Sequence, residues 1–161
     1  MAQEIERKFL VWSEAWRAAA TGSKLLRQGY LSSNAKATVR VRTRDDTEAM
    51  ITIKSAARGI SRAEYEYDIP VEDAREMLEL ARPHVIEKRR HIVPFGGLVW
   101  EVDVFDGRHA GLVIVEVELD DEAQAVELPE WVGLEVSHDD RYANASLARA
   151  DGPPPVDPDA A

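Results

Sequence analysis

Apolar and charged residues alternate with a period of two over most of the chain. Successive side chains of a β-strand point to opposite faces, so this alternation predicts strands with one apolar and one charged face. In the first of them, Glu4, Glu6 and Lys8 share a face opposite Ile5 and Phe9. The pattern predicts eight strands in all, at 4–9, 26–30, 38–44, 48–54, 61–69, 85–93, 99–105 and 112–119.

Few segments show the helical period. Ser13 is a suitable N-cap for a short helix over residues 14–20. After Pro70, apolar residues at helical spacing predict one amphipathic helix over 71–81. A C-terminal helix is predicted over 142–150, because two acidic residues stand where acids favour a helix start.

Length and composition indicate one folded domain. The chain has 161 residues, of which 45% are hydrophobic, enough for a substantial core. We expect this domain to span residues 1–150, since no repeat or linker interrupts them. Residues 151–161 are rich in proline and acid and poor in apolar side chains, and they are predicted to be a disordered tail.

The bulk chemistry restricts location and partners. Without cysteine the chain can form neither disulfides nor thiolate metal sites, and no stretch has the length of a membrane span. We therefore expect a cytoplasmic protein that does not bind membranes. A net charge of −10 also argues against nucleic acid as a partner, so any bound anion must be held by local basic groups. The oligomeric state stays open, with a homodimer as one option.

The charged strand faces can point either to solvent or to an enclosed interior. An open antiparallel sheet with a solvated charged face is the common arrangement. Two features favour an interior instead. Charges segregate by sign within most strands, whereas a solvated surface more naturally mixes them, and eight strands suffice to close a barrel around one small ligand. We therefore predict an α+β fold in which an eight-stranded antiparallel β-barrel tunnel has a charged lumen and a few flanking helices.

The chemistry of that predicted lining indicates its ligand. Its acidic residues are Glu4, Glu6, Glu64, Glu66, Glu101, Asp103, Glu116 and Glu118, and its basic residues are Lys8, Arg40, Arg42, Lys54, Arg62, Lys88 and Arg90. A simple anion receptor has no use for the carboxylates, and a cation site has none for the guanidinium groups. A polyphosphate bound with a divalent metal needs both. Oxygen ligands alone suit the hard cations Mg²⁺ and Mn²⁺.

The opening Glu4-x-Glu6-x-Lys8 resembles the ExExK signature of the CYTH superfamily, the triphosphate tunnel metalloenzymes. The resemblance extends over nearly the whole predicted domain, in the order found in the family. The similar segments are 28–31 (QGYL), 39–42 (VRVR), 51–54 (ITIK), 64–66 (EYE), 87–90 (EKRR), 100–105 (WEVDVF), 115–118 (VEVE) and 140–144 (DRYAN). The short length is most similar to the bacterial inorganic triphosphatases of this superfamily.

The resemblance implies metal-dependent hydrolysis of inorganic triphosphate, or of a related triphosphate, within the tunnel. It implies a metal held by Glu4 and Glu6, with Glu116 and Glu118 as ligands of a second metal. Glu64 and Glu66 would be further ligands or lie behind them. The implied phosphate clamp is Arg40, Arg42, Lys54, Lys88 and Arg90, with Arg62 a less secure member. Glu101 and Asp103 would orient these basic residues, with contact to the metal as the alternative role for Asp103.

Lys8 and Tyr30 resemble a catalytic pair proposed for inorganic triphosphatases. An ammonium group near a phenol lowers the pKa of that phenol, which makes phenolate a potential base for water and favours activity at alkaline pH. The alternative for Tyr30 is a hydrogen-bonded wall residue without a chemical role.

Other functions stay open on the sequence alone. A thiamine triphosphatase would need an aromatic or apolar pocket at a tunnel mouth, and a class IV adenylate cyclase would share the triphosphate-binding lining. A non-catalytic sensor of polyphosphate or nucleotides would keep the basic clamp but would not need the Glu4 and Glu6 pair. A purely structural barrel would use none of this chemistry.

Overall fold

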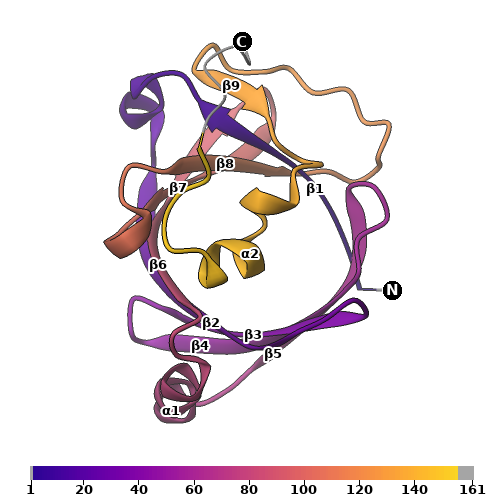
Figure 1. Cartoon of the computed structure of the whole chain (residues 1–161). Coiled ribbons are helices and arrows are strands. Elements are labelled where there is room, and N and C mark those ends of the chain that lie inside the picture. Colours follow the sequence, from indigo (N-terminus) through magenta and orange to yellow (C-terminus); the bar gives the residue numbers. More distant parts are fainter. Residues whose placement is uncertain (1, 156–161) are drawn as a thin grey trace.

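The computed structural model describes residues 2–155, which fold into a closed antiparallel β-barrel with short helices around it (Figure 1). The strands are β1 (Gln3–Val11), β2 (Gly22–Ser33), β3 (Ala37–Arg44), β4 (Glu48–Ser55), β5 (Ser61–Asp68), β6 (Val85–Phe95), β7 (Leu98–Phe105), β8 (Val113–Glu118) and β9 (Val132–Glu135). The α-helices are α1 (Val71–Ala81) and α2 (Asn144–Arg149), and single 3₁₀ turns are η1 (Ala15–Ala19), η2 (Gly107–His109) and η3 (Asp140–Tyr142).

The barrel closes through β1. The strands follow the order β5-β4-β3-β2-β6-β7-β8-β1-β9, and an additional pairing between β5 and β1 completes the ring of eight. This confirms the predicted eight-stranded barrel. The short β9 was not predicted, and it pairs with β1 outside the ring. Residues 156–161, which hold most of the predicted disordered tail, lie outside the described part of the chain.

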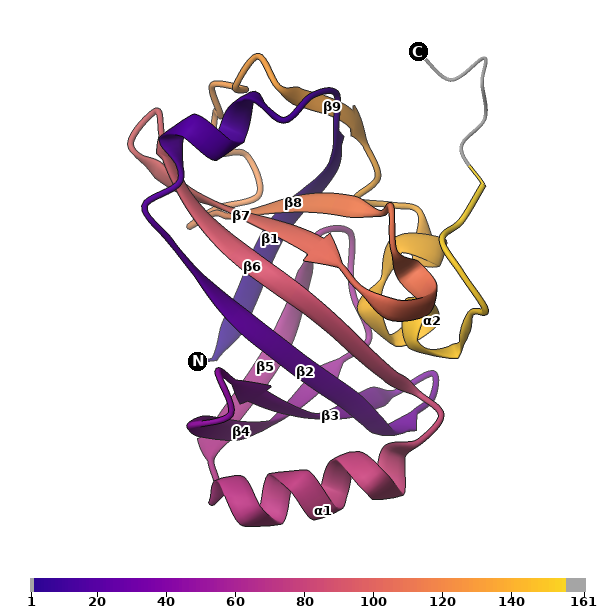
Figure 2. The ribbon, with the colours of Figure 1, turned by 90° about the vertical axis from the view of Figure 1, so that its left-hand side faces the viewer.

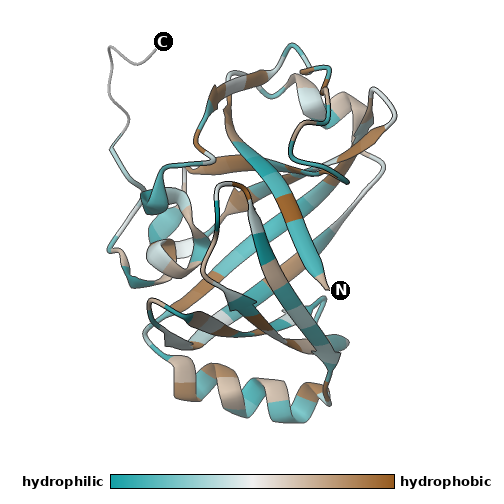
Figure 3. Ribbon diagram, turned by 90° about the vertical axis from the view of Figure 1, so that its right-hand side faces the viewer, coloured by the Kyte–Doolittle hydropathy of each residue, from teal (hydrophilic) through white to brown (hydrophobic). Residues whose placement is uncertain are grey.

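Apolar strand faces point outward, and flanking elements cover most of them, although Ile53, Tyr65 and Tyr67 of β4 and β5 stay exposed. Around β1, β7 and β8 the cover comes from Trp16 of η1 and from Trp131 and Val132 at β9. Helix α1 lies across the outside of β3 and β4 (Figure 2), where Ala74 packs on Val41. Colouring by hydropathy shows the alternation of apolar and polar residues along single strands (Figure 3). The charged faces are therefore left to line the interior, as predicted.

Gly29 lets α1 sit close to the barrel. A Cβ atom at this position would lie 2.7 Å from the Cβ of Ala81 and 3.2 Å from a methyl group of Leu78. Carbon atoms do not approach each other at such a distance, so any larger residue would force α1 away from β2.

The C-terminal segment fills one end of the barrel, where α2 lies inside the ring of strands (Figure 1). Leu147 and Ala148 are buried there against Tyr30 and Phe105. The predicted helix over 142–150 is thus shorter than expected. A 3₁₀ turn precedes it, and the extended backbone of Ala143 separates the two, so that α2 starts at residue 144.

His109 holds the C-terminal segment at this end of the barrel. Its ring is 1% exposed, lies edge-on to Phe105, and places Nε2 2.5 Å from the Leu147 carbonyl oxygen. Burial, with a smaller effect of the Arg108 charge, lowers the pKa of His109 below its usual 6.5, although the hydrogen bond to Leu147 opposes this. The imidazole therefore stays neutral in the fold.

Because His109 is buried in its neutral form, its contribution to the free energy of unfolding decreases as the pH falls. The contribution of His109 is complete above the pKa of about 6.5 that it has in the unfolded chain, and it is lost as the pH falls below that value. Between pH 7.5 and 5, we expect the melting temperature of the wild type to fall further than that of His109→Gln, whose amide can still donate to Leu147. Parallel curves for the two proteins would refute this assignment.

Candidate active site

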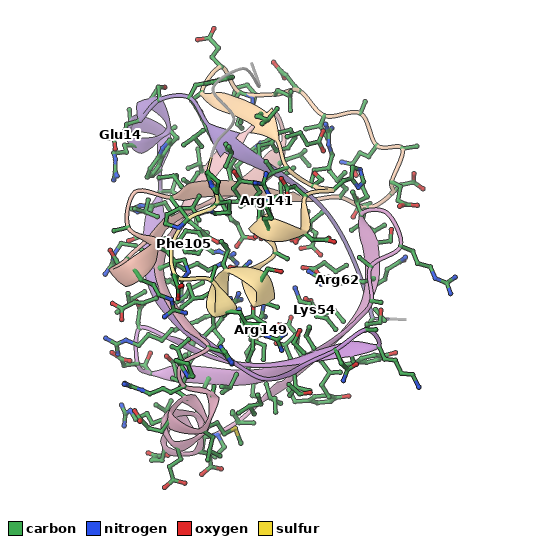
Figure 4. The ribbon with its side chains drawn as sticks, viewed as in Figure 1. Glu14, Lys54, Arg62, Phe105, Arg141 and Arg149 are labelled. Atoms are coloured by element: carbon green, nitrogen blue, oxygen red, sulfur yellow. The ribbon has the colours of Figure 1, made fainter. Side chains whose placement is uncertain are left out.

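A cavity of about 190 Å³ follows the barrel axis, and every side chain that lines it is charged except Asn144. The lining residues are Glu4, Glu6, Arg40, Arg42, Arg44, Lys54, Glu64, Glu66, Arg90, Glu101, Glu116, Glu118 and Asn144. Figure 4 shows Lys54 and Arg62 pointing into the barrel, with α2 across its end. The structure thus brings together eleven of the predicted site residues, from β1, β3, β4, β5, β6, β7 and β8.

Three arginines concentrate positive charge in this cavity. Arg40 and Arg42 come from one face of β3, and Arg90 comes from β6. Burial, with the positive charges of Arg40 and Arg90, lowers the pKa of Arg42. The Nε atom of Arg40 is buried without a hydrogen-bond partner among the described residues. Guanidinium groups that repel one another and keep an unused buried donor are arranged for an anion.

Asp103 holds two of the basic side chains in place. It is 0% exposed, accepts from Arg90 Nε and Nη2 at 2.8 and 2.9 Å, and lies 2.7 Å from Lys88 Nζ. The strand register places Asp103 directly opposite Arg90. Burial alone would raise the pKa of Asp103, but Arg90 and Lys88 lower it below its usual value, so the carboxylate is charged. Lys88 also donates to Asn144 Oδ1 at 3.0 Å, which ties the clamp to α2.

Glu101 contributes less to this network. Its carboxylate accepts from Arg90 at 3.3 Å and is a third exposed, whereas Asp103 is enclosed. The two acids of β7 therefore differ in role, because the inner one is enclosed by cations and the outer one lies nearer solvent.

The carboxylates form a second group, built around Glu4, Glu6 and Glu116. Glu4 lies 3.0 Å from Lys54 and 3.2 Å from Arg62. Glu116 lies 3.4 Å from Arg90 and 3.7 Å from Lys8. Glu6 has no ion pair within 4.0 Å in residues 2–155, and burial together with the charges of Glu116 and Glu4 raises its pKa to about 8.

These carboxylates have the chemistry of a divalent metal site, although they are not yet gathered into one. In the described residues, no three acidic or histidine side chains are grouped closely enough to hold an ion. Glu6 nevertheless experiences the repulsion of two neighbouring carboxylates, and burial with the charges of Glu4, Glu101 and Glu66 also raises the pKa of Glu118. A cation would relieve both repulsions, so the residues fit a hard metal ion.

Five predicted residues do not line the axial cavity. Lys88 and Asp103 lie behind Arg90, fully buried, and Lys8 and Arg62 face a smaller cavity in the wall. Tyr30 is packed with apolar residues beside α2, and its hydroxyl accepts from Gln28 Nε2 at 3.1 Å.

No hydrogen bond joins Lys8 to Tyr30 within residues 2–155. Lys8 Nζ instead donates to the carbonyl oxygen of Tyr142 at 3.1 Å. The side-chain oxygen of Gln28 accepts from Arg42 Nε at 2.9 Å, so the Gln28 amide connects the Tyr30 hydroxyl to Arg42.

Three lining or supporting residues were missed by the strand pattern. Arg44 continues the basic face of β3 beyond Arg42, so the same alternation could have identified it. Gln28 lies on β2, and its link to Arg42 depends on the register of β2 and β3. Asn144 enters the cavity only because the C-terminal segment folds back, which no local signal indicates.

The chain matches known proteins over nearly its full length. A family model described as CYTH domain matches residues 2–149. Two curated relatives are named inorganic triphosphatase. The protein from Acetivibrio thermocellus is 47% identical over 150 residues, covering 92% of this chain and 95% of its own. The protein from Nitrosomonas europaea is 40% identical over 150 residues, covering 90% and 96%.

A solved structure shares the fold. The crystal structure of the inorganic triphosphatase NE1496 superposes with a TM-score of 0.66 at 36% identity, covering 91% of this chain and 98% of that one. It therefore resembles this chain along its whole barrel.

Proposed function

Because the chain belongs to the CYTH domain family, as its first strand had suggested, we propose that it hydrolyses inorganic triphosphate to orthophosphate and pyrophosphate with the help of a divalent metal. The observation that carries this proposal is the pairing of two mutually repelling groups in one cavity. The arginines around Arg42 need an anion, and the carboxylates around Glu6 need a cation. A metal–polyphosphate complex supplies both.

The carboxylates would hold the metal. Glu4 and Glu6 would bind near the terminal phosphoryl group, Glu116 and Glu118 would bind a second ion, and the less buried Glu64 and Glu66 would support them. When bound, Mg²⁺ or Mn²⁺ supplies Lewis-acid polarisation of the phosphoryl oxygens and lowers the pKa of water.

The basic residues would bind the phosphate oxygens. Arg40, Arg42, Lys54 and Arg90 line the cavity, while Lys88 and Arg62 stand just behind it. Phosphoryl transfer develops charge on these oxygens, so fixed cations in a closed barrel stabilise the transition state. Asp103 fixes Arg90 by two hydrogen bonds, so this guanidinium is already oriented before substrate binds.

Lys8 and Tyr30 do not line the axial cavity and would act from beside it, near α2. Lys8 is held there by Glu116 and the Tyr142 carbonyl, in position to bind a terminal phosphate oxygen. Tyr30 would act as a base through its phenolate, which the hydrogen bond donated by Gln28 Nε2 would stabilise. In the present geometry the Gln28 amide also connects Tyr30 to Arg42.

The lining favours an inorganic substrate over an organic triphosphate. Thiamine or a nucleoside needs an aromatic or apolar surface, and the axial cavity offers none among its lining residues. An organic group placed against this wall would instead displace water from the acids and arginines without compensating them.

Phosphate release tests this proposal directly. With Mg²⁺ or Mn²⁺ we expect turnover of tripolyphosphate to exceed that of thiamine triphosphate and of ATP by at least about tenfold. With EDTA we expect no turnover above the buffer blank. Turnover independent of metal would refute the metal role, and equal rates on ATP would refute the substrate assignment.

The cellular context is part of the same proposal. The absence of cysteine suits a reducing cytoplasm. None of the helices in the described range 2–155 has the length and apolar character of a membrane span. Whether the protein forms a homodimer would be tested by sedimentation.

A further inference from the structure

A second cavity, of about 110 Å³, opens through the barrel wall beside the axial one. Glu6 lines both cavities. Of its lining residues, Lys8 is buried and Glu6, Arg62 and Ala143 are half-buried, whereas Ala57 and Asp140 are exposed and mark its outer part. The lateral cavity and the candidate active site therefore share the side chain of Glu6 as a wall.

The wall is thin here because the barrel seam is short. The β1–β5 pairing comprises three residue pairs, which end at Ile5 and Ser61. One further hydrogen bond joins the Glu6 amide to the Ile60 carbonyl at 3.3 Å. Beyond it, β1 turns to another partner, since the Lys8 amide donates to Ser137 Oγ. The connection between β4 and β5 and the segment leading to α2 thus border a gap that no strand of residues 2–155 closes.

This gap matters because the C-terminal segment fills one end of the barrel. On the proposed function, water attacks the terminal phosphorus, its oxygen bonds to that atom, and the bridging bond breaks with its electron pair on pyrophosphate. A water proton passes to the pyrophosphate oxygen or to solvent. The orthophosphate then lies near Glu6 and Lys8, between the pyrophosphate and α2, and it cannot reach the open mouth until pyrophosphate has gone.

We propose that the lateral cavity is the exit for orthophosphate, an inference that rests on the proposed function. Lys8 and Arg62 offer cations at its inner end, so an anion can leave the clamp stepwise. Asp140 lies at its outer part, where its carboxylate repels the orthophosphate dianion and so opposes both its retention and its re-entry. Pyrophosphate, with two linked phosphates, would leave through the axial mouth.

Ala57→Trp tests the exit, and Ala56→Trp is its matched control. Both alanines are exposed and adjacent, but Ala57 lines the lateral cavity and Ala56 does not. In single turnovers of tripolyphosphate with Mg²⁺, acid quenching measures orthophosphate formed, and a fluorescent phosphate-binding protein measures orthophosphate released. For Ala57→Trp we expect formation to be unchanged and release to be slowed at least about fivefold, whereas the control behaves like the wild type.

Ala143→Leu fills the same cavity from its opposite side and should give the same delay. In the steady state, kcat and KM should fall together in both variants, with kcat/KM unchanged, because the delay follows the chemical step. Release that keeps pace with formation in both blocked variants would overturn the exit. Slowed formation would also overturn it. A wild type that forms no orthophosphate from tripolyphosphate would refute the proposed function itself, which is a separate outcome.

Discussion

Replacing Asp103 with alanine is expected to lower the free energy of unfolding by about 3–5 kcal/mol, because removal of one partner leaves buried charges uncompensated. Asp103 is the carboxylate between Lys88 and Arg90, at 2.7 to 2.9 Å from both, and neither Asp103 nor Lys88 is exposed. Denaturant unfolding at pH 7.5 would measure the change. The clamp should also lose its orientation, so activity should fall even at temperatures where the variant stays folded.

Glu101→Gln provides the control on the same strand. Its carboxylate is a third exposed and makes one long hydrogen bond of 3.3 Å to Arg90, so we expect a loss of at most about 1 kcal/mol. If the two substitutions had equal effects on stability, Asp103 would not be the residue that organises the clamp.

Glu6→Gln is expected to reduce kcat by roughly 100- to 1000-fold without reducing stability. The amide cannot replace an anionic metal ligand, which accounts for the loss of activity. Stability should be kept or increased, because burial and the charges of Glu116 and Glu4 oppose the ionisation of Glu6. Steady-state kinetics with Mg²⁺ and thermal unfolding of the same preparation would measure both effects.

Glu135→Gln is the control for Glu6→Gln, since it removes a carboxylate that lies outside the cavity. Glu135 lies on β9, outside the ring, where it pairs with Arg7 of β1, and it does not line the cavity. Its activity should match the wild type. Wild-type activity in Glu6→Gln would remove Glu6 from the metal site, and strong destabilisation would show that its charge supports the fold.

The sequence predicted the barrel because its alternation is regular and its charges are segregated. The alternation along each strand indicates which residues share a face, and eight such strands suffice to close a barrel. It did not predict β9, which has four residues, includes Gly133 and has no charge alternation of its own. The start of the last helix was also missed, since the extended conformation of Ala143 is imposed by packing at the barrel end.

The membership of the candidate site was easier to predict than its internal contacts. The alternation of side chains along each strand places Lys88 and Asp103 on the inner face of the barrel. Their contact, however, depends on the register between β6 and β7. Likewise, nothing local indicates that Lys8 bonds to the Tyr142 carbonyl, because that contact requires the last turn to enter the barrel. The separation of Lys8 from Tyr30 follows from the same packing.

The three partners of β1 have a consequence for biosynthesis. The first strand pairs with residues 61–63, 114–118 and 132–135, so most of its hydrogen bonds await segments made more than a hundred residues later. On the ribosome, at about 5–20 residues per second, the emerging amino terminus stays without those partners for on the order of ten seconds. Such non-local pairing also folds slowly, so the barrel closes only after most of the chain has been made.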